Sequence, residues 1–356
     1  MIAKGEDISA HRHPGRGTQA GRRGRAYADN AAGHGREAAE ADLRRFVEDE
    51  AGEFPAILAV WQALGTRGKL LGSRDSFAWG MLPLLICGEL GMESPRALPL
   101  STATECFIAA LDVLDDLEDE DALDALWRSC GRATATNVAT LLLFLYQRAL
   151  AGLVDLCHDP SLVSAVQRIY ATAGIRACAG QQQDLDGSAQ DEDQYLGMVA
   201  RKTGSLTQGI CRAAATLATS DQTVIDRYAE LGLNLGIAMQ IANDVAAIAT
   251  EEDRNDLMGG KKELSLLFAL ASAPAEQRGW LEALLERARA SKIDPPDLDR
   301  LRGMLQATGA FHYALLVADV YWERALAGLS SSPLRGLVET MRSWEAEPMA
   351  GGINAG

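Results

Sequence analysis

A dense run of carboxylates follows an apolar segment in the first half of the chain. Six of the seven residues from Asp115 to Asp121 are acidic, and they come directly after the segment CFIAALDVL. On a helix, Asp115 and Asp119 lie one turn apart on one face, with Asp116 beside them. Mg2+ prefers hard oxygen ligands, commonly one or two carboxylates together with waters and phosphate oxygens. The run predicts a magnesium site at a helix end, although an acidic cluster alone is more often a solvated surface.

A second polar cluster lies in the second half of the chain, in the segment QIANDVAAIATEE. There Gln240, Asn243 and Asp244 interrupt an apolar helical pattern that ends in further acids. Asn243, Ala247 and Glu251 share one helix face at successive turns. An Asn-Asp pair near a helix end is common by itself. Two such helix ends facing one another across an apolar pocket could hold Mg2+ together with phosphate oxygens of a substrate.

The elements that must position these residues are helices. Hydrophobic residues make up 47% of the chain and strand-type alternation is nearly absent, which predicts an all-α protein. Helical patterns joined by short loops occupy residues 39–346 and predict one large helical bundle around a central apolar cavity. Residues 1–38 are rich in Gly and Arg and are expected to form a disordered basic tail whose deletion leaves catalysis intact. Residues 347–356 are expected to be a flexible C-terminus.

Composition excludes several classes of partner. The formal net charge of -15 disfavours nucleic acid. No uncharged apolar segment reaches the length of a membrane span, so none is expected. The N-terminal segment lacks the apolar stretch of a signal peptide. The six cysteines show no Cys-x-x-Cys spacing, which predicts reduced thiols in a cytoplasmic protein and gives zinc little support.

Five motifs in order resemble the trans-polyprenyl synthetase superfamily, the class I isoprenoid enzymes, over nearly everything after residue 50. DDLED, which runs from Asp115 to Asp119, is similar to the first aspartate-rich motif, and QIANDVAA stands where the family has Gln followed by its second such motif. Between them, GQQQD and YLGMVARKTGSL resemble the Gln-x-x-Asp and Lys-Thr segments. After them, NDLMGGKKELSLLFAL resembles the Asp-Leu-x-x-Gly-Lys run.

The resemblance implies a class I isoprenoid synthase fold and an enzyme that ionises an allylic prenyl diphosphate with three Mg2+ ions. It assigns catalysis and metal binding to carboxylates and amides on two opposite sides of the pocket. These residues are Asp115, Asp116 and Asp119 on one side and Asn243, Asp244 and Glu251 on the other.

The resemblance also implies the residues that bind the substrate. Lys202 and Lys261 would neutralise the diphosphate, and Ala110, where the family carries a bulky aromatic residue in members with short products, indicates farnesyl or geranylgeranyl diphosphate. The expected substrate-binding residues are Lys69, Phe107, Ala110, Leu111, Gln181, Asp184, Lys202, Thr203, Gln240 and Lys261. A homodimer is the expected assembly.

The sequence departs from the family where chain-elongating members bind isopentenyl diphosphate. RGKLLGSRD keeps Lys69 and offers Arg74, but it lacks the arginine directly after the lysine, and DALWRSCGR has only Arg128 and Arg132 in place of an Arg-Arg pair. The segment from Asn243 to Glu251 also partly resembles the metal triad of terpene synthases. We therefore expect a terpene synthase, a cyclase. The alternative is a prenyltransferase, either chain-elongating or acting on another acceptor, and a third reading is a catalytically silent regulatory subunit.

Overall fold

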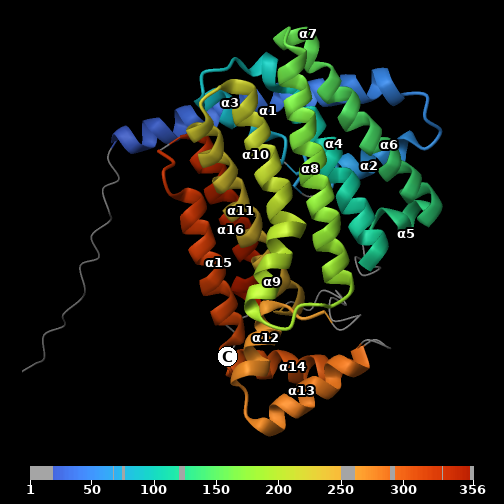
Figure 1. Ribbon diagram of the computed structural model, residues 1–356, viewed down its shortest axis with the longest axis vertical. Coiled ribbons are helices and arrows are strands. Elements are labelled where there is room, and N and C mark those ends of the chain that lie inside the picture. The colour runs from blue at the N-terminus through green and yellow to red at the C-terminus, as the bar shows by residue number, and fades with distance from the viewer. Residues whose placement is uncertain are drawn as a thin grey trace, which may run out of the picture.

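The chain forms a bundle of helices in a computed structural model (Figure 1). The structure describes residues 19–66, 68–73, 77–119, 125–249, 261–288, 293–330 and 332–352. Every regular element within these ranges is a helix, which confirms the all-α prediction. The helices are α1 (Gln19–Ala51), α2 (Ile57–Leu64), α3 (Met81–Glu89), α4 (Ser94–Asp119), α5 (Leu126–Cys130), α6 (Arg132–Ala151), α7 (Leu153–Cys157), α8 (Pro160–Leu185), α9 (Glu192–Val199), the π-helix η1 (Ala200–Gly204), α10 (Ser205–Ala218), α11 (Gln222–Ala249), α12 (Leu264–Ser272), α13 (Ala275–Ala288), α14 (Pro295–Ala307), α15 (Ala310–Leu326) and α16 (Pro333–Gly352).

Long helices pack side by side to form the bundle. Helix α4 packs on α6, α10 packs on α8 and α11, and α11 packs on α15. The C-terminal ends of α4, α8 and α11 lie at one end of the bundle, the lower end in Figure 1, where α12, α13 and α14 also lie. This arrangement brings three polar helix ends together although they are far apart in the sequence.

Helix α4 shows why the acidic ends lie beside the core. Every residue from Leu100 to Ala110 is buried, which is typical of a helix that other helices surround on all sides. The acidic residues from Asp112 to Asp119 occupy its last two turns and border the cavity described below. In α11, apolar residues are buried as far as Ile248, while Gln240, Asn243 and Asp244 line the cavity.

Three helical segments are long and apolar enough to cross a membrane by length and composition, which the sequence did not lead us to expect. The α4 and α11 segments are mostly buried inside the bundle, so their apolar residues form its core. The third segment, 132–157, is mostly exposed and carries Phe144 on its outer face.

The N-terminal segment differs from the expected tail. Helix α1 begins at Gln19, so the boundary expected at residue 39 falls inside a helix, while residues 1–18 lie outside the described ones. The C-terminal boundary expected at residue 347 likewise falls inside α16. Leu43 and Val47 of α1 are fully buried in the core. All six cysteines are free thiols.

Candidate active site

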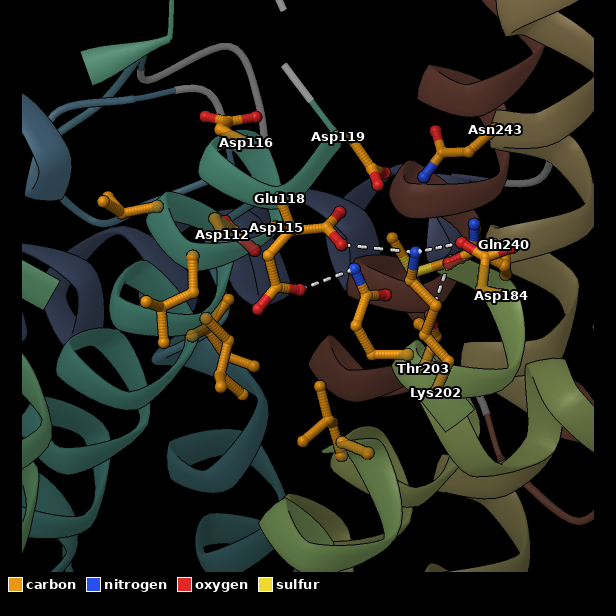
Figure 2. Close-up of a pocket in the computed structure, with 18 of the residues that line it drawn as sticks. Asp112, Asp115, Asp116, Glu118, Asp119, Asp184, Lys202, Thr203, Gln240 and Asn243 are labelled. Atoms are coloured by element: carbon orange, nitrogen blue, oxygen red, sulfur yellow. Dashed lines mark hydrogen bonds and ion pairs between the residues drawn. The ribbon is translucent and has the colours of Figure 1, made fainter. Parts of the chain in front are cut away.

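A cavity of about 690 Å³ lies where the ends of α4, α8 and α11 converge. Figure 2 shows the carboxylates of α4 on one side and Gln240 and Asn243 of α11 on the other, with Lys202 between them. Asp244 also lines the cavity. The structure thus brings the two polar clusters of the sequence together across one hollow.

Lys202 joins two helix ends. Its ammonium lies 3.2 Å from a carboxylate oxygen of Asp115 on α4 and 2.8 Å from one of Asp184 on α8. Burial lowers the pKa of Lys202, but the two acids outweigh burial and raise that pKa above its ordinary value. Burial likewise raises the pKa of Asp184, and the neighbouring lysines outweigh it, so that the carboxylate stays ionised.

Lys261 repeats this arrangement from the other side of Asp184. Its ammonium lies 2.8 Å from Asp119 and 3.1 Å from Asp184. Burial and the charge of Asp115 raise the pKa of Asp119 to about 6, although Lys261 opposes the shift. More Asp and Glu side chains than Lys side chains line the cavity, and the excess negative charge would favour additional cations.

Asp244 is held by two side chains that point it toward the cavity. Gln240 donates to one of its carboxylate oxygens at 2.7 Å, and the hydroxyl of Tyr195 donates to the other. Gln240 in turn accepts a hydrogen bond from the Thr203 hydroxyl. Burial raises the pKa of Asp244 to about 6, although the hydrogen bonds from Tyr195 and Gln240 lower it. Tyr195 was not among the predicted site residues, although it precedes Lys202 by two helical turns, and that spacing could have identified it.

The π-helix η1 places Lys202 and Thr203 in the cavity wall. Its backbone approaches α8 so closely that a Cβ atom on Gly180 would lie 2.2 Å from the backbone nitrogen of Lys202. Only glycine fits at this point of α8. A π-turn inserts an extra residue into a helix and often marks a functional site. Here it aims the lysine at Asp115 and Asp184 while α8 and α10 stay packed.

Most of the predicted residues line the cavity. They are Lys69, Leu111, Asp115, Asp116, Asp119, Gln181, Asp184, Lys202, Thr203, Gln240, Asn243, Asp244 and Lys261. Glu251 lies outside the described residues.

Phe107 and Ala110 do not line the cavity, contrary to expectation. Phe107 packs against the rings of Tyr146 and Tyr170, with ring centroids 4.9 and 5.4 Å away, and Ala110 is fully buried. The reason is the rotation of α4, which turns Ile108 and Leu111 toward the cavity instead.

The residues present fit Mg2+ that is shared with a diphosphate. Within the described residues, no three His, Cys, Asp or Glu side chains are gathered closely enough to hold a metal ion alone. Oxygen donors instead line two walls of one cavity, and a diphosphate between them would complete the ligand set. Gln181 supplies a further sign of fit, because its buried side-chain oxygen has no hydrogen-bond partner while its nitrogen donates to Glu118 at 2.9 Å.

Sequence comparisons give relatives of one kind. A model of the polyprenyl synthetase family matches residues 79–319. Tryptophan prenyltransferase ComQ of Bacillus spizizenii is 32% identical over 201 residues, which cover 56% of this chain and 68% of the relative. Geranylgeranyl diphosphate synthase of Mycobacterium tuberculosis is 28% identical over 285 residues, which cover 76% of this chain and 79% of the relative.

Solved structures show the same fold. A polyprenyl synthase from Caulobacter crescentus, complexed with calcium and isoprenyl diphosphate, superposes with a TM-score of 0.73 at 21% identity, covering 87% of this chain and 94% of that one. A polyprenyl synthetase from Streptomyces coelicolor gives a TM-score of 0.71 at 23% identity, covering 89% of this chain and 99% of that one.

Proposed function

The chain belongs to the polyprenyl synthetase family, and on that basis we propose that it is a Mg2+-dependent prenyltransferase that ionises an allylic prenyl diphosphate and transfers the prenyl group to an acceptor. One observation carries the proposal. Lys202 and Lys261 meet on Asp184 and tie it to the carboxylates Asp115 and Asp119, in the wall of a cavity that apolar side chains also line.

The chemistry that such a site supports is heterolysis of a carbon-oxygen bond. The electron pair leaves with the diphosphate, whose negative charge grows in the transition state, so fixed cations beside it lower the barrier. Bound Mg2+ would supply most of that positive charge. We expect three ions, held by Asp115, Asp116 and Asp119 on α4 and by oxygen donors of α11.

The lysines and the apolar side chains of the cavity would bind the two parts of the substrate. Lys202 and Lys261 would bind diphosphate oxygens that the metal leaves free. The prenyl chain would lie against apolar side chains deeper in the cavity, where water that could quench an allylic cation is excluded. The lining residues of this apolar part include Leu111, Ala177, Met198, Leu206 and Met239.

The relatives favour transfer over cyclisation. We expected a cyclase from the altered second motif and the missing arginine pair, but the relatives are named prenyltransferases and prenyl diphosphate synthases. These names support a prenyltransferase, which was the alternative to the cyclase in the sequence analysis. A catalytically silent subunit has little support, because the network of Lys202, Lys261 and three carboxylates is intact.

Product analysis tests the proposal. The purified chain is incubated with Mg2+ and geranyl, farnesyl or geranylgeranyl diphosphate, with and without acceptors, and pyrophosphate release and products are measured by mass spectrometry. We expect Mg2+-dependent pyrophosphate release coupled to a prenylated product. Hydrocarbon or alcohol products formed at the same rate without any acceptor would favour the cyclase instead.

Assembly and location remain predictions. We expect a homodimer, which gel filtration with light scattering would detect, and a cytoplasmic location, which agrees with the six free thiols.

A further inference from the structure

The carboxylates of α4 that would hold Mg2+ lie close to the end of that helix. Asp115, Asp116 and Asp119 all line the cavity, and Asp119 is the last residue of α4. The carbonyl groups in the last turn of a helix need hydrogen-bond donors from outside it, and helix ends fray where such donors are weak. The arrangement of these carboxylates therefore depends on how firmly the last turn of α4 is held.

Two side chains from α5 and α6 donate hydrogen bonds to the backbone of that turn. The indole N-H of Trp127 donates to the carbonyl oxygen of Asp116 at 3.0 Å. The guanidinium of Arg132, the first residue of α6, donates to the carbonyl oxygen of Leu117 at 2.7 Å. Its positive charge also lies at the C-terminal end of α4, where the helix dipole is negative. Two successive carbonyls of the last turn are thus bound from outside the helix.

The two donors also contact one another. The guanidinium carbon of Arg132 lies 5.4 Å from the ring centroid of Trp127, and that of Arg128 lies 4.5 Å from it. A guanidinium at such a distance is attracted to the π-electrons of the ring. Arg132 therefore binds both the α4 backbone and the ring that carries the second donor, so the Trp127–Arg132 pair acts as one unit.

The short helix α5 holds this pair against α4. It packs on α2, α4 and α6, and Figure 1 shows it beside the C-terminal end of α4. Its residue Leu126 is buried and lines the cavity. Gly131 connects α5 to α6 with a φ of 83°, a conformation that glycine adopts without strain, and its N-H donates to the Trp127 carbonyl at 2.8 Å. This turn sets the position of Arg132 relative to Trp127.

These backbone contacts differ from the lysine contacts to the same helix end. Lys202 and Lys261 bind carboxylate oxygens of Asp115 and Asp119, which a metal ion would also use. The lysine contacts therefore compete with metal binding. The hydrogen bonds from α5 and α6 occupy no carboxylate oxygen, so they are compatible with bound metal.

Resting on the proposed function, we propose that Trp127 and Arg132 are positioning residues for the metal site: they keep the last turn of α4 wound, so that its carboxylates are arranged before Mg2+ binds. A turn that is wound only part of the time binds the ions less tightly by that fraction. The pair thus acts on the affinity for the ions and leaves the bond-breaking step unchanged. Arg132 belongs to the segment DALWRSCGR, so this arginine serves the metal site and not a second anion.

Ion affinity in the full-length protein tests the role of the pair. Trp127→Phe removes the N-H and keeps an aromatic ring, and Arg132→Met removes the guanidinium and keeps an apolar stem. Thermal melts with a fixed pyrophosphate concentration give the Mg2+ concentration that produces half of the stabilisation. We expect it to rise about 2- to 10-fold in each variant, as for one lost hydrogen bond. In the double variant it should rise about 10- to 100-fold. Arg132→Lys, which keeps a charged donor, should retain most of the affinity.

Kinetics separate this role from substrate binding. In each variant kcat at saturating Mg2+ should stay within about 2-fold of the unchanged protein, while the half-saturating Mg2+ concentration rises. The matched control is Trp280→Phe, which changes a tryptophan on α13 that packs against Arg300, 4.2 Å from its ring centroid. This control should shift neither quantity. A higher KM for isopentenyl diphosphate at saturating Mg2+, with unchanged ion affinity, would make Arg132 a substrate ligand and refute the proposal.

Hydrogen exchange tests the helix end without any donor or metal. The backbone amides of residues 115–119 should exchange faster in the double variant than in Trp280→Phe, because the last turn of α4 unwinds more often. Equal exchange, or equal Mg2+ dependence of the melts, would overturn the positioning role. Failure of the proposed function would look different: the unchanged protein would release no pyrophosphate from any allylic diphosphate, while exchange at the end of α4 would still respond to the variants.

Discussion

The Lys261 ammonium donates a hydrogen bond to a carboxylate oxygen of Asp119, 2.8 Å away, although the two residues are 142 positions apart in the chain. Both side chains are largely buried, and both border the same cavity. Lys202 forms the equivalent link between Asp115 and Asp184. The lysines thus compensate part of the charge that would otherwise force these carboxylates apart, so the site is assembled before any ion or substrate binds.

Removing one carboxylate of this network should abolish turnover. In Asp115→Ala we expect kcat/KM to fall by more than about 100-fold, because Lys202 loses a partner and Mg2+ loses a ligand. Asp115 is 44% exposed, so the melting temperature should change little. Asp155→Ala, an exposed acid on α7, serves as the control. Full turnover in Asp115→Ala would contradict the metal assignment.

The Tyr195 hydroxyl should matter for metal binding. Tyr195→Phe removes the hydrogen bond to Asp244 and keeps the buried ring, so the fold should persist. We expect the apparent Mg2+ affinity to weaken by about 10- to 100-fold, as for other residues that orient a metal ligand. Tyr228→Phe removes a similar tyrosine-carboxylate bond, to Glu89, far from the cavity and provides the control. Equal Mg2+ dependence in both variants would refute the role of Tyr195.

Motif and helical spacing were sufficient to predict Asp115, Asp119 and Asp244 as neighbours of one cavity. The same reasoning misplaced Phe107, because spacing by whole turns does not fix the rotation of α4 relative to α6 and α8. Nor could it predict the contact between Asp112 and Lys69, which are 43 residues apart and share no pattern. Local periodicity determines which residues share a face, whereas packing between helices determines which face turns inward.

Glu105 should make stability depend on pH. Burial raises its pKa to about 7, although Lys69 and two backbone N-H groups oppose the shift. The folded protein therefore holds a proton that the unfolded chain releases near pH 4.5, and this contribution to the unfolding free energy is lost as pH rises toward 7. Its size is on the order of 3 kcal/mol.

Urea denaturation at pH 5 and pH 8 tests this expectation. The unchanged protein should lose more stability between these pH values than Glu105→Gln does, because glutamine does not titrate. The difference between the two proteins isolates Glu105 from all other titrating groups. Equal losses would show that Glu105 is ionised throughout this range.

The N-terminal segment should divide into a dispensable part and a required part. Deleting residues 1–18 should leave turnover unchanged. Deleting residues 1–38, which we expected from the sequence to be harmless, also removes Arg36 and its hydrogen bond to the loop that carries Lys69. We now expect that deletion to lower prenyl transfer, and Arg36→Ala in the full chain to reproduce the loss. Unchanged transfer in both variants would show that Arg36 is not needed.

Two glycines of α8 offer a matched comparison of how backbone packing positions Lys202. In Gly180→Ala the new Cβ would lie 2.2 Å from the Lys202 nitrogen and 2.6 Å from its Cα, both of them backbone atoms that cannot rotate away. Helix α8 and η1 must separate, so we expect a loss of about 1–3 kcal/mol in unfolding free energy, together with a loss of turnover as Lys202 leaves Asp115 and Asp184.

Gly174→Ala is the control on the same helix. Its Cβ would meet the Phe107 ring at 3.5 Å, which is ordinary van der Waals contact. Because alanine favours helix more than glycine does, this variant should be as stable as the unchanged protein or gain up to about 1 kcal/mol. Denaturant titrations and turnover assays of both variants separate the two effects. If Gly180→Ala retained full turnover, the close approach of α8 to η1 would not be what positions the lysine.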